Sequence, residues 1–193
     1  NMLLLNHCVA EVDGLPAIFL NESPLTSRPT AALSKSLLDK SLALLAILVL
    51  SPLLLLFALL IKLTSPGPVI FKQDRHGWNG EVIKVWKFRS MRVHDDHEVR
   101  QASRNDSRIT PVGRFIRRTS IDELPQLFNV LQGHMALVGP RPHAVAHNDY
   151  YSGKIHAYMA RHRIKPGITG LAQINGCRGE TETLEKMQKR VDI

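Results

Sequence analysis

The apolar residues of the chain are concentrated in one long segment. Residues 41–61 are 21 consecutive positions without a charge, and 18 of them are Ala, Val, Ile, Leu or Phe. As a helix, this segment is about 31 Å long, which is enough to cross the hydrocarbon core of a bilayer. Ser34 and Ser36 are good N-cap residues, so the pattern predicts a helix that begins near them and continues through the apolar segment.

Ser51 and Pro52 interrupt this segment at its centre. Proline removes a backbone hydrogen bond and disfavours helical geometry at the residue before it, whereas the Ser51 hydroxyl can bind the carbonyl that the proline frees. Two membrane arrangements remain open: a kinked spanning helix, or a re-entrant helix hairpin over residues 35–63 that breaks at Ser51-Pro52 and returns to the same face. Basic residues on both sides favour the re-entrant hairpin under the positive-inside rule. These residues are Lys35, Lys40, Lys62 and Lys72.

The hydrophobic pattern after the apolar segment predicts a small α+β domain, mainly helical, over residues 64–193. Strand-like runs at 69–73 and 81–88 predict a short β-hairpin. A helix over 113–119 is expected to turn Phe115 and Ile116 inward. An amphipathic helix is expected over 124–131, ended by Gly133. Further helices are expected over 143–162 and 181–191, and the polar residues 92–108 predict an exposed helix or loop.

Residues 1–34 have a different character. They contain two short apolar runs and a stretch rich in Ser, Thr and Pro, and the chain begins with Asn rather than Met. We interpret them as the end of a preceding N-terminal domain followed by a linker.

The charge of the chain is also unevenly placed. The formal net charge is +8; residues 62–118, with 13 basic and 6 acidic side chains, carry +7 of it. This basic block adjoins the apolar segment, which favours an anionic membrane surface and phosphorylated substrates over nucleic acid. Cys8 and Cys177 are too few and too far apart to indicate a disulfide framework or a zinc site, so a reducing compartment is expected.

The segment from Ser120 to Pro125 is the most informative candidate site. Ser120 and Glu123 have the spacing of a capping box, a purely structural interpretation that stays open. In the functional interpretation, the helix N-terminus keeps Asp122 ionised and available as a nucleophile. Glu123 beside it is a candidate ligand of Mg²⁺, since sites for this ion usually combine one or two carboxylates with substrate phosphates.

Candidate phosphate-binding residues lie on both sides of these carboxylates. Arg141 is the strongest, because Pro140 and Pro142 fix its backbone and leave a bidentate guanidinium with little entropy to lose. The others are Lys87, Arg89 and Arg118. A zinc site at His143 and His147 is disfavoured, because Ala144 stands where a zinc-protease helix has its Glu.

With these residues assembled, the chain closely resembles the bacterial sugar transferase family, the monotopic phosphoglycosyl transferases. The resemblance runs from about Lys35 to Val191 and rests on short motifs in the same order. These motifs are the Ser51-Pro52 break, Ser65-Pro66-Gly67-Pro68, Lys87-Phe88-Arg89-Ser90-Met91, Asp122-Glu123-Leu124-Pro125-Gln126, Gly139-Pro140-Arg141-Pro142 and Lys165-Pro166-Gly167-Ile168-Thr169-Gly170.

The resemblance implies a re-entrant membrane helix and an active site on the cytoplasmic face of the bacterial inner membrane. It further implies Mg²⁺, held by the dyad Asp122 and Glu123, a UDP-sugar donor and undecaprenyl phosphate as acceptor. The segments 114–133 and 176–183 look most like the subgroup that transfers glucose 1-phosphate or galactose 1-phosphate for exopolysaccharide, including colanic acid. The family normally continues past Ile193, so the catalytic domain is expected to be incomplete here. The sequence leaves a homodimer open.

A second class of function explains the same charge pattern. A non-catalytic, membrane-anchored adaptor would use the basic block to bind anionic lipid or nucleic acid. In that case Asp122 and Glu123 would tolerate substitution, whereas charge reversal at Arg117 and Arg118 would weaken binding.

Overall fold

The computed structural model describes residues 7–12, 15–20, 29–92, 106–143, 145, 158–177 and 184–192. Helices predominate, and the strands that are described form three two-stranded sheets, in keeping with the expected mainly helical α+β class. The helices are α2 (Pro29–Thr64), α3 (Pro111–Thr119), α4 (Gln126–Leu131), α6 (Leu171–Ile174) and α7 (Leu184–Asp192), with short 3₁₀ helices η2 (Trp78–Gly80), η3 (Ile121–Glu123) and η4 (Tyr158–Arg163). The strands are β1 (His7–Val12), β2 (Leu15–Leu20), β3 (Ile70–His76), β4 (Val82–Phe88), β5 (Ala136–Val138) and β6 (Gly167–Thr169).

Helix α2 contains the whole apolar segment. It begins at Pro29, so the predicted start near Ser34 or Ser36 is too late; proline suits a first turn because its φ is already helical. The helix continues through Pro52 instead of dividing there, so the predicted break is a bend within one helix. Pro52 cannot donate to the carbonyl of Leu48, and the Ser51 hydroxyl takes that place at 2.8 Å, as the sequence predicted.

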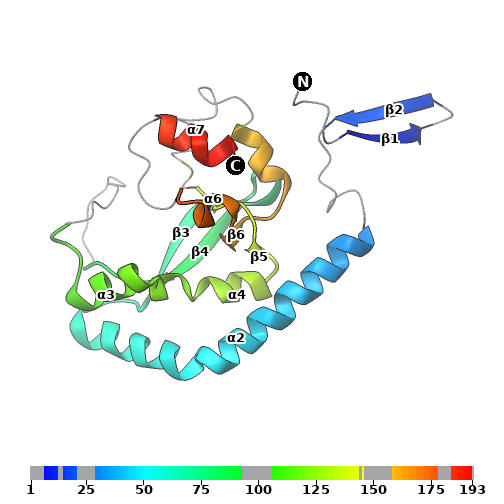
Figure 1. The fold of residues 1–193 in the computed structure, drawn as a ribbon. Coiled ribbons are helices and arrows are strands. Elements are labelled where there is room, and N and C mark those ends of the chain that lie inside the picture. Colours follow the sequence, from blue (N-terminus) through cyan, green and yellow to red (C-terminus); the bar gives the residue numbers. More distant parts are fainter. Residues whose placement is uncertain are drawn as a thin grey trace.

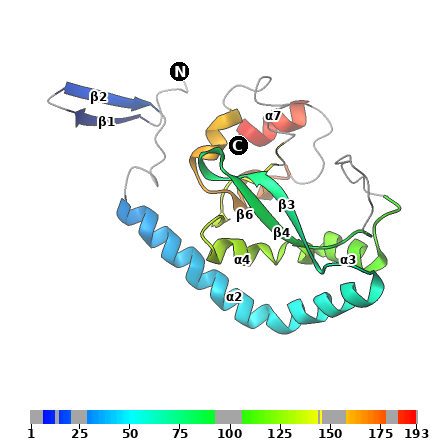
Figure 2. The ribbon, with the colours of Figure 1, turned by 180° about the vertical axis from the view of Figure 1, so that it is seen from behind.

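The bend gives α2 two different faces. Figures 1 and 2 show the helix curving along one side of the domain, with α3 and α4 on its concave side. Ala43, Leu54, Phe57 and Ile61 are buried on that side. Many leucines on the rest of the helix are exposed, such as Leu48, which is 63% exposed. The helix is long and apolar enough to cross a membrane.

The β3–β4 hairpin, predicted over 69–73 and 81–88, is confirmed with antiparallel pairing. In Figure 1 it lies on the far side of α4 from α2, with α7 beyond it. Ile83 and Val85 pack with Leu127 and Val130 of α4 against the first half of α2. Burying a side chain of this kind contributes about 1.5–3 kcal/mol. The hydrophobic periodicity of both elements is therefore explained by one shared core.

Asn129 joins α4 to the hairpin by hydrogen bonds. It is fully buried, its Oδ1 accepts from the Trp86 backbone N–H at 2.9 Å, and its Nδ2 donates to the Lys84 carbonyl at 2.8 Å. These two backbone groups point away from β3, so the Asn129 amide satisfies them as a neighbouring strand would.

Helix α3 confirms the predicted helix over 113–119. Thr110 caps its start by accepting from Gly113 N, with Pro111 following, so the helix begins two residues earlier. Ile116 is fully buried against the second half of α2. Phe115 is 48% exposed, so its predicted inward orientation is wrong; one residue is about 100° around a helix, and the ring instead stacks on Phe57 with centroids 5.9 Å apart.

Strands β5 and β6 form a parallel pair that the sequence did not predict. The chain passes very close to itself here, because a Cβ added to Gly139 would lie 2.3 Å from the Lys165 carbonyl oxygen. This contact fixes the beginning of the Gly139-Pro140-Arg141-Pro142 turn.

The expected helix over 143–162 lies largely outside the described residues, as does most of the segment 92–108. Residues 158–163 form η4. Helix α7 confirms the expected last helix from residue 184 onward.

Candidate active site

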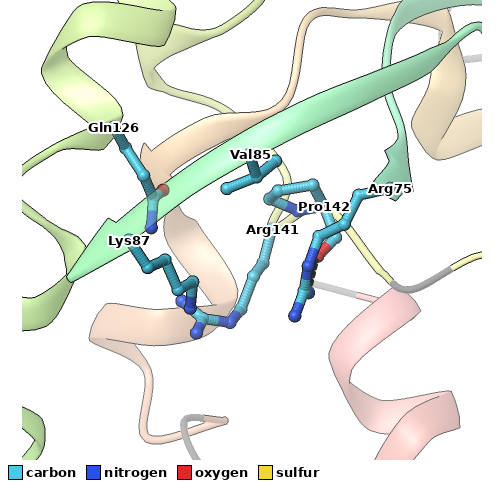
Figure 3. A pocket seen from close by; sticks show the side chains of 6 residues that line it. All are labelled: Arg75, Val85, Lys87, Gln126, Arg141 and Pro142. Atoms are coloured by element: carbon cyan, nitrogen blue, oxygen red, sulfur yellow. Dashed lines mark hydrogen bonds between the residues drawn. The ribbon is translucent and has the colours of Figure 1, made fainter. Parts of the chain in front are cut away.

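Three chain segments bring Lys87, Glu123 and Arg141 together. Lys87 Nζ lies 2.8 Å from Glu123 Oε1. Arg141 donates to both carboxylate oxygens, at 2.6 Å to Oε1 and 3.2 Å to Oε2. Figure 3 shows the side chains of Lys87 and Arg141 converging from β4 and from the turn after β5. The sequence predicted all three as site residues, and the structure places them in one cluster.

The backbone around Ser120 aims Glu123 into this cluster. Ser120 has φ +63°, a left-handed conformation that ends α3 and starts η3. Its side chain caps no helix, and the Glu123 carboxylate is bonded to Lys87 and Arg141. The predicted capping box is therefore wrong: two cations compete better for a carboxylate than one backbone N–H does.

The two neighbouring carboxylates have opposite electrostatic environments. Burial works against the ionised form of Glu123, but the hydrogen bonds from Arg141 and the charge of Lys87 outweigh it and lower its pKa. Burial raises the pKa of Asp122, and the charge of Lys87 opposes that rise. The expectation that a helix N-terminus favours the ionised form of Asp122 is therefore wrong, because η3 is only three residues long and burial raises the pKa of this carboxyl. The charges of Lys87, Arg117 and Arg141 favour the anion but offset burial only in part.

Asp122 is also less constrained than Glu123. Within the part of the chain that the structure describes, its carboxylate takes part in no hydrogen bond or ion pair. Glu123 is engaged by two cations, so of the two carboxylates it is Asp122 that is available to react.

Arg75, which the sequence analysis missed, lies beside the same cluster. Figure 3 shows it beside Arg141, together with Val85, Gln126 and Pro142. Burial, together with the charge of Arg141, lowers the pKa of Arg75 to about 10. Strand alternation could have identified it, because the hairpin pairs Phe71 with Lys87 and thereby puts residue 75 on the Lys87 face.

The Arg141 turn is held from two sides. Arg75 Nη1 donates to the Pro142 carbonyl, and Arg161 Nη2 from η4 donates to the Arg141 carbonyl. Arg161 also lies 2.8 Å from His143 Nδ1, which is 2.7 Å from the Tyr158 hydroxyl. A guanidinium has no acceptor, so His143 Nδ1 must accept the bond. His143 thus serves the packing of this turn, and His147, its partner in the disfavoured zinc site, lies outside the described residues.

Two predicted phosphate-binding residues lie outside the cluster. Arg89 is buried and donates to the carbonyls of Ser65 and Pro66, so it holds the turn after α2. Arg118 is exposed; Arg117 is the α3 residue whose charge acts on Asp122.

Among the described residues, the site therefore combines a carboxylate that has no hydrogen bond or ion pair with more cations than anions, beside a helix suited to a membrane. An arrangement of this kind can bind an anion such as a phosphate beside a candidate nucleophile. The family model for bacterial sugar transferases matches residues 30–193. The chain belongs to the bacterial sugar transferase family.

Several similar proteins are named as transferases of a sugar phosphate to undecaprenyl phosphate. A UDP-glucose:undecaprenyl-phosphate glucose-1-phosphate transferase of Escherichia coli (strain K12) is 56% identical over 191 residues, which is 98% of this chain and 41% of that protein. A protein of the same name from Xanthomonas campestris pv. campestris is 51% identical over 97% of this chain and 39% of its own length. A UDP-N-acetylgalactosamine-undecaprenyl-phosphate N-acetylgalactosaminephosphotransferase of Aeromonas hydrophila is 45% identical over 80% of this chain and 38% of its own. The chain thus spans about two fifths of the length of these relatives.

Proposed function

We propose that the chain transfers a hexose 1-phosphate from a UDP-sugar to undecaprenyl phosphate, with release of UMP. The observation that carries this proposal is the cluster of Lys87, Glu123 and Arg141 beside the unbonded carboxylate of Asp122. UDP-glucose is the favoured donor, because the relatives of highest identity named above are glucose-1-phosphate transferases. UDP-galactose is the alternative donor. The product would be the first lipid-linked intermediate of exopolysaccharide, O-antigen or capsule assembly.

The first step is attack by Asp122 on the phosphorus that bears the sugar. A bond forms between Asp122 Oδ and this phosphorus, the bond to the bridging oxygen breaks, and UMP leaves with the electron pair. Lys87 and Arg141 lie where they can bind oxygens of the diphosphate in place of Glu123. The diphosphate of the UDP-sugar carries two negative charges, one on each phosphate, against the single charge of Glu123, so substrate binding would release Glu123 from these donors.

The second step returns the enzyme to its starting state. An oxygen of undecaprenyl phosphate attacks the same phosphorus, and the bond to Asp122 breaks, which restores the carboxylate and gives a diphosphate-linked sugar. A covalent intermediate suits this pair of substrates, because one is water-soluble, the other is held in lipid, and the two need not be bound together.

The carboxylates of Glu123 and Asp122 fit a Mg²⁺ site if the substrate phosphates supply further oxygen ligands. Among the described residues, no three His, Cys, Asp or Glu side chains gather as a protein cage for a metal. Mg²⁺ is commonly bound by only one or two carboxylates together with substrate phosphates. Glu123, with Asp122 next to it, would supply the carboxylates. When bound, the ion would neutralise charge on the diphosphate. Lys87 and Arg141 would donate hydrogen bonds to phosphate oxygens as well.

Helix α2 would hold this site at the membrane surface. We propose that the bent helix enters one leaflet and returns to the cytoplasmic face, with the exposed leucines of its convex side in lipid. The Ser51 hydrogen bond leaves no unsatisfied Leu48 carbonyl at the bend, which a hydrocarbon environment requires.

Replacement of Asp122 by Asn tests the nucleophile. We expect UMP release from UDP-glucose in membranes with undecaprenyl phosphate to be abolished, because the amide cannot form the intermediate. Asp74→Asn is a matched control, since Asp74 is an exposed carboxylate that pairs with Lys84 on the hairpin. Undiminished release by the Asp122 variant would refute its role.

Chelation separates the transferase from the membrane-anchored adaptor. EDTA should stop UMP release and leave membrane attachment intact, whereas an adaptor predicts that Asp122 and Glu123 can be replaced without effect. The buried position of Lys87, only 17% exposed, argues against the adaptor, because a cation that binds lipid headgroups should be exposed.

Cysteines placed at Lys35 and Thr64 test the topology of helix α2. Labelling of the two positions from opposite faces of the membrane would exclude the re-entrant arrangement.

A further inference from the structure

Arg75 is a largely buried cation whose partners are all neutral. Its guanidinium donates to Gln73 Oε1, at 2.7 Å from Nη2, and to the Pro142 carbonyl. Within the described residues it makes no ion pair with a carboxylate. An ionised side chain that is removed from water without a counter-ion is costly, so an unpaired buried guanidinium is unusual.

The charges around Arg75 do not supply its counter-ion. Glu123 carries one negative charge and already binds Lys87 and Arg141. Burial and the positive charge of Arg141 both disfavour the charged form of Arg75, and the attraction of Glu123 offsets them only in part. The site is therefore short of at least one negative charge on the Arg75 side.

Arg75 lies on the side of Arg141 away from Lys87. Lys87 and Arg141 both contact Glu123, and both act electrostatically on Asp122. Arg75 makes neither contact, and Figure 3 shows its guanidinium on the side of Arg141 away from Lys87. The cations thus follow one another from Lys87 through Arg141 to Arg75, and only the first two bind the carboxylate that adjoins the candidate nucleophile.

We propose that Arg75 is a substrate-binding residue for the second phosphate of the donor, the one that leaves with the nucleoside. This inference rests on the proposed function and adds a residue to it. If Asp122 attacks the sugar-bearing phosphorus, the other phosphate must lie on the side away from Asp122. As the bond to the bridging oxygen breaks, negative charge builds on that phosphate, and a guanidinium there stabilises it.

UMP is the probe, because it carries only the phosphate in question. We expect the purified chain in detergent micelles to bind UMP, measured by isothermal titration calorimetry. Arg75→Gln should weaken this affinity at least tenfold, and Arg75→Lys should retain most of it. Lys84→Gln is the matched control: it removes one positive charge from the same hairpin, at an exposed side chain paired with Asp74, and should leave UMP affinity within twofold.

The lysine variant distinguishes ligand binding from support of the Pro142 turn. Lysine keeps the charge but cannot reproduce the guanidinium contacts to Gln73 and Pro142, so equal losses in the lysine and glutamine variants would overturn the proposal. A glutamine variant that binds UMP within twofold of the wild type would overturn it as well. Failure of the proposed function would look different: the wild type would release no UMP from UDP-glucose, whatever the UMP affinities of the Arg75 variants.

Discussion

Replacement of Glu123 by Gln should destabilise the fold, because it leaves two buried cations without their shared anion. The Glu123 side chain is 12% exposed, and those of Lys87 and Arg141 are 17% and 26% exposed. Removing one partner of a buried ion pair typically costs 3–5 kcal/mol. Some water reaches these groups, so we expect a loss of about 3 kcal/mol in the free energy of unfolding. With a typical m-value of about 2 kcal/mol/M, this loss lowers the urea midpoint by about 1.5 M.

The effect should depend on pH with a definite sign. The folded pKa of Glu123 lies below its ordinary value of 4.5, so its contribution to stability is fully present above pH 4.5. It is lost as the pH falls through the lower, folded pKa. The difference in stability between the wild type and the glutamine variant should therefore be constant from pH 7 to about pH 5 and shrink in more acidic solution. Urea unfolding in detergent micelles, followed by tryptophan fluorescence, measures it.

A second substitution tests the physical reason. If uncompensated charge causes the loss, Lys87→Met in the Glu123→Gln background should restore at least about 1 kcal/mol, because it removes one of the two cations. Asp74→Asn, which breaks an exposed ion pair, should change stability by less than about 1 kcal/mol. A glutamine variant as stable as the wild type, or a double variant less stable than the single one, would refute the reasoning.

Three further changes test separate features. Gly113→Ala puts a Cβ 1.9 Å from the Ser90 carbonyl oxygen, so we expect a loss of about 3 kcal/mol and a lower unfolding temperature. Arg161→Ala removes a donor to the Arg141 carbonyl and should lower kcat/KM for UMP release about tenfold, with no further loss when Arg141 is already Ala. Pro52→Ala restores a backbone donor at the bend of α2, and cysteines at the two ends of the helix should then label from opposite faces.

Each of these has a contrary outcome. An unchanged unfolding temperature in the Gly113 variant would mean that α3 can move away from Ser90. Equal losses from Arg161→Ala with and without the Arg141 side chain would mean that Arg161 acts elsewhere; Arg163→Ala, an exposed residue on the same 3₁₀ helix, is its control. Labelling from one face in the Pro52 variant would show that the proline does not set the path of the helix.

Local patterns sufficed to predict the elements that share one core. Alternation in 81–88 and the spacing of Leu124, Leu127 and Leu131 both report packing against α2, and both elements are confirmed, although Phe128 on the predicted apolar face is exposed. The parallel pairing of β5 with β6 could not be read this way. Each strand has three residues, and the pair depends on close backbone approach at Gly139 and Gly167, which no hydrophobic period records.

The residue types of the site could be predicted from the sequence, but the groups that each side chain contacts could not. Lys87 and Arg89 have the spacing of one strand face, but β4 ends at Phe88, so Arg89 turns to Ser65 instead. Ser120 and Glu123 fit a capping box in sequence, and only the three-dimensional approach of two cations shows why that bond does not form. Arg75 was missed because its place beside Lys87 and Arg141 depends on the register of the hairpin.

The amide of Asn129 also has a consequence for how this chain behaves before it meets a membrane. A two-stranded hairpin offers free edges, and an edge that presents unpaired N–H and C=O groups can add a strand from another molecule. By occupying the Trp86 N–H and the Lys84 carbonyl, Asn129 closes that edge with a side chain from the chain itself. A protein that already carries an exposed row of leucines on α2 has particular need of such protection against aggregation, and one buried amide provides it at the centre of the hairpin.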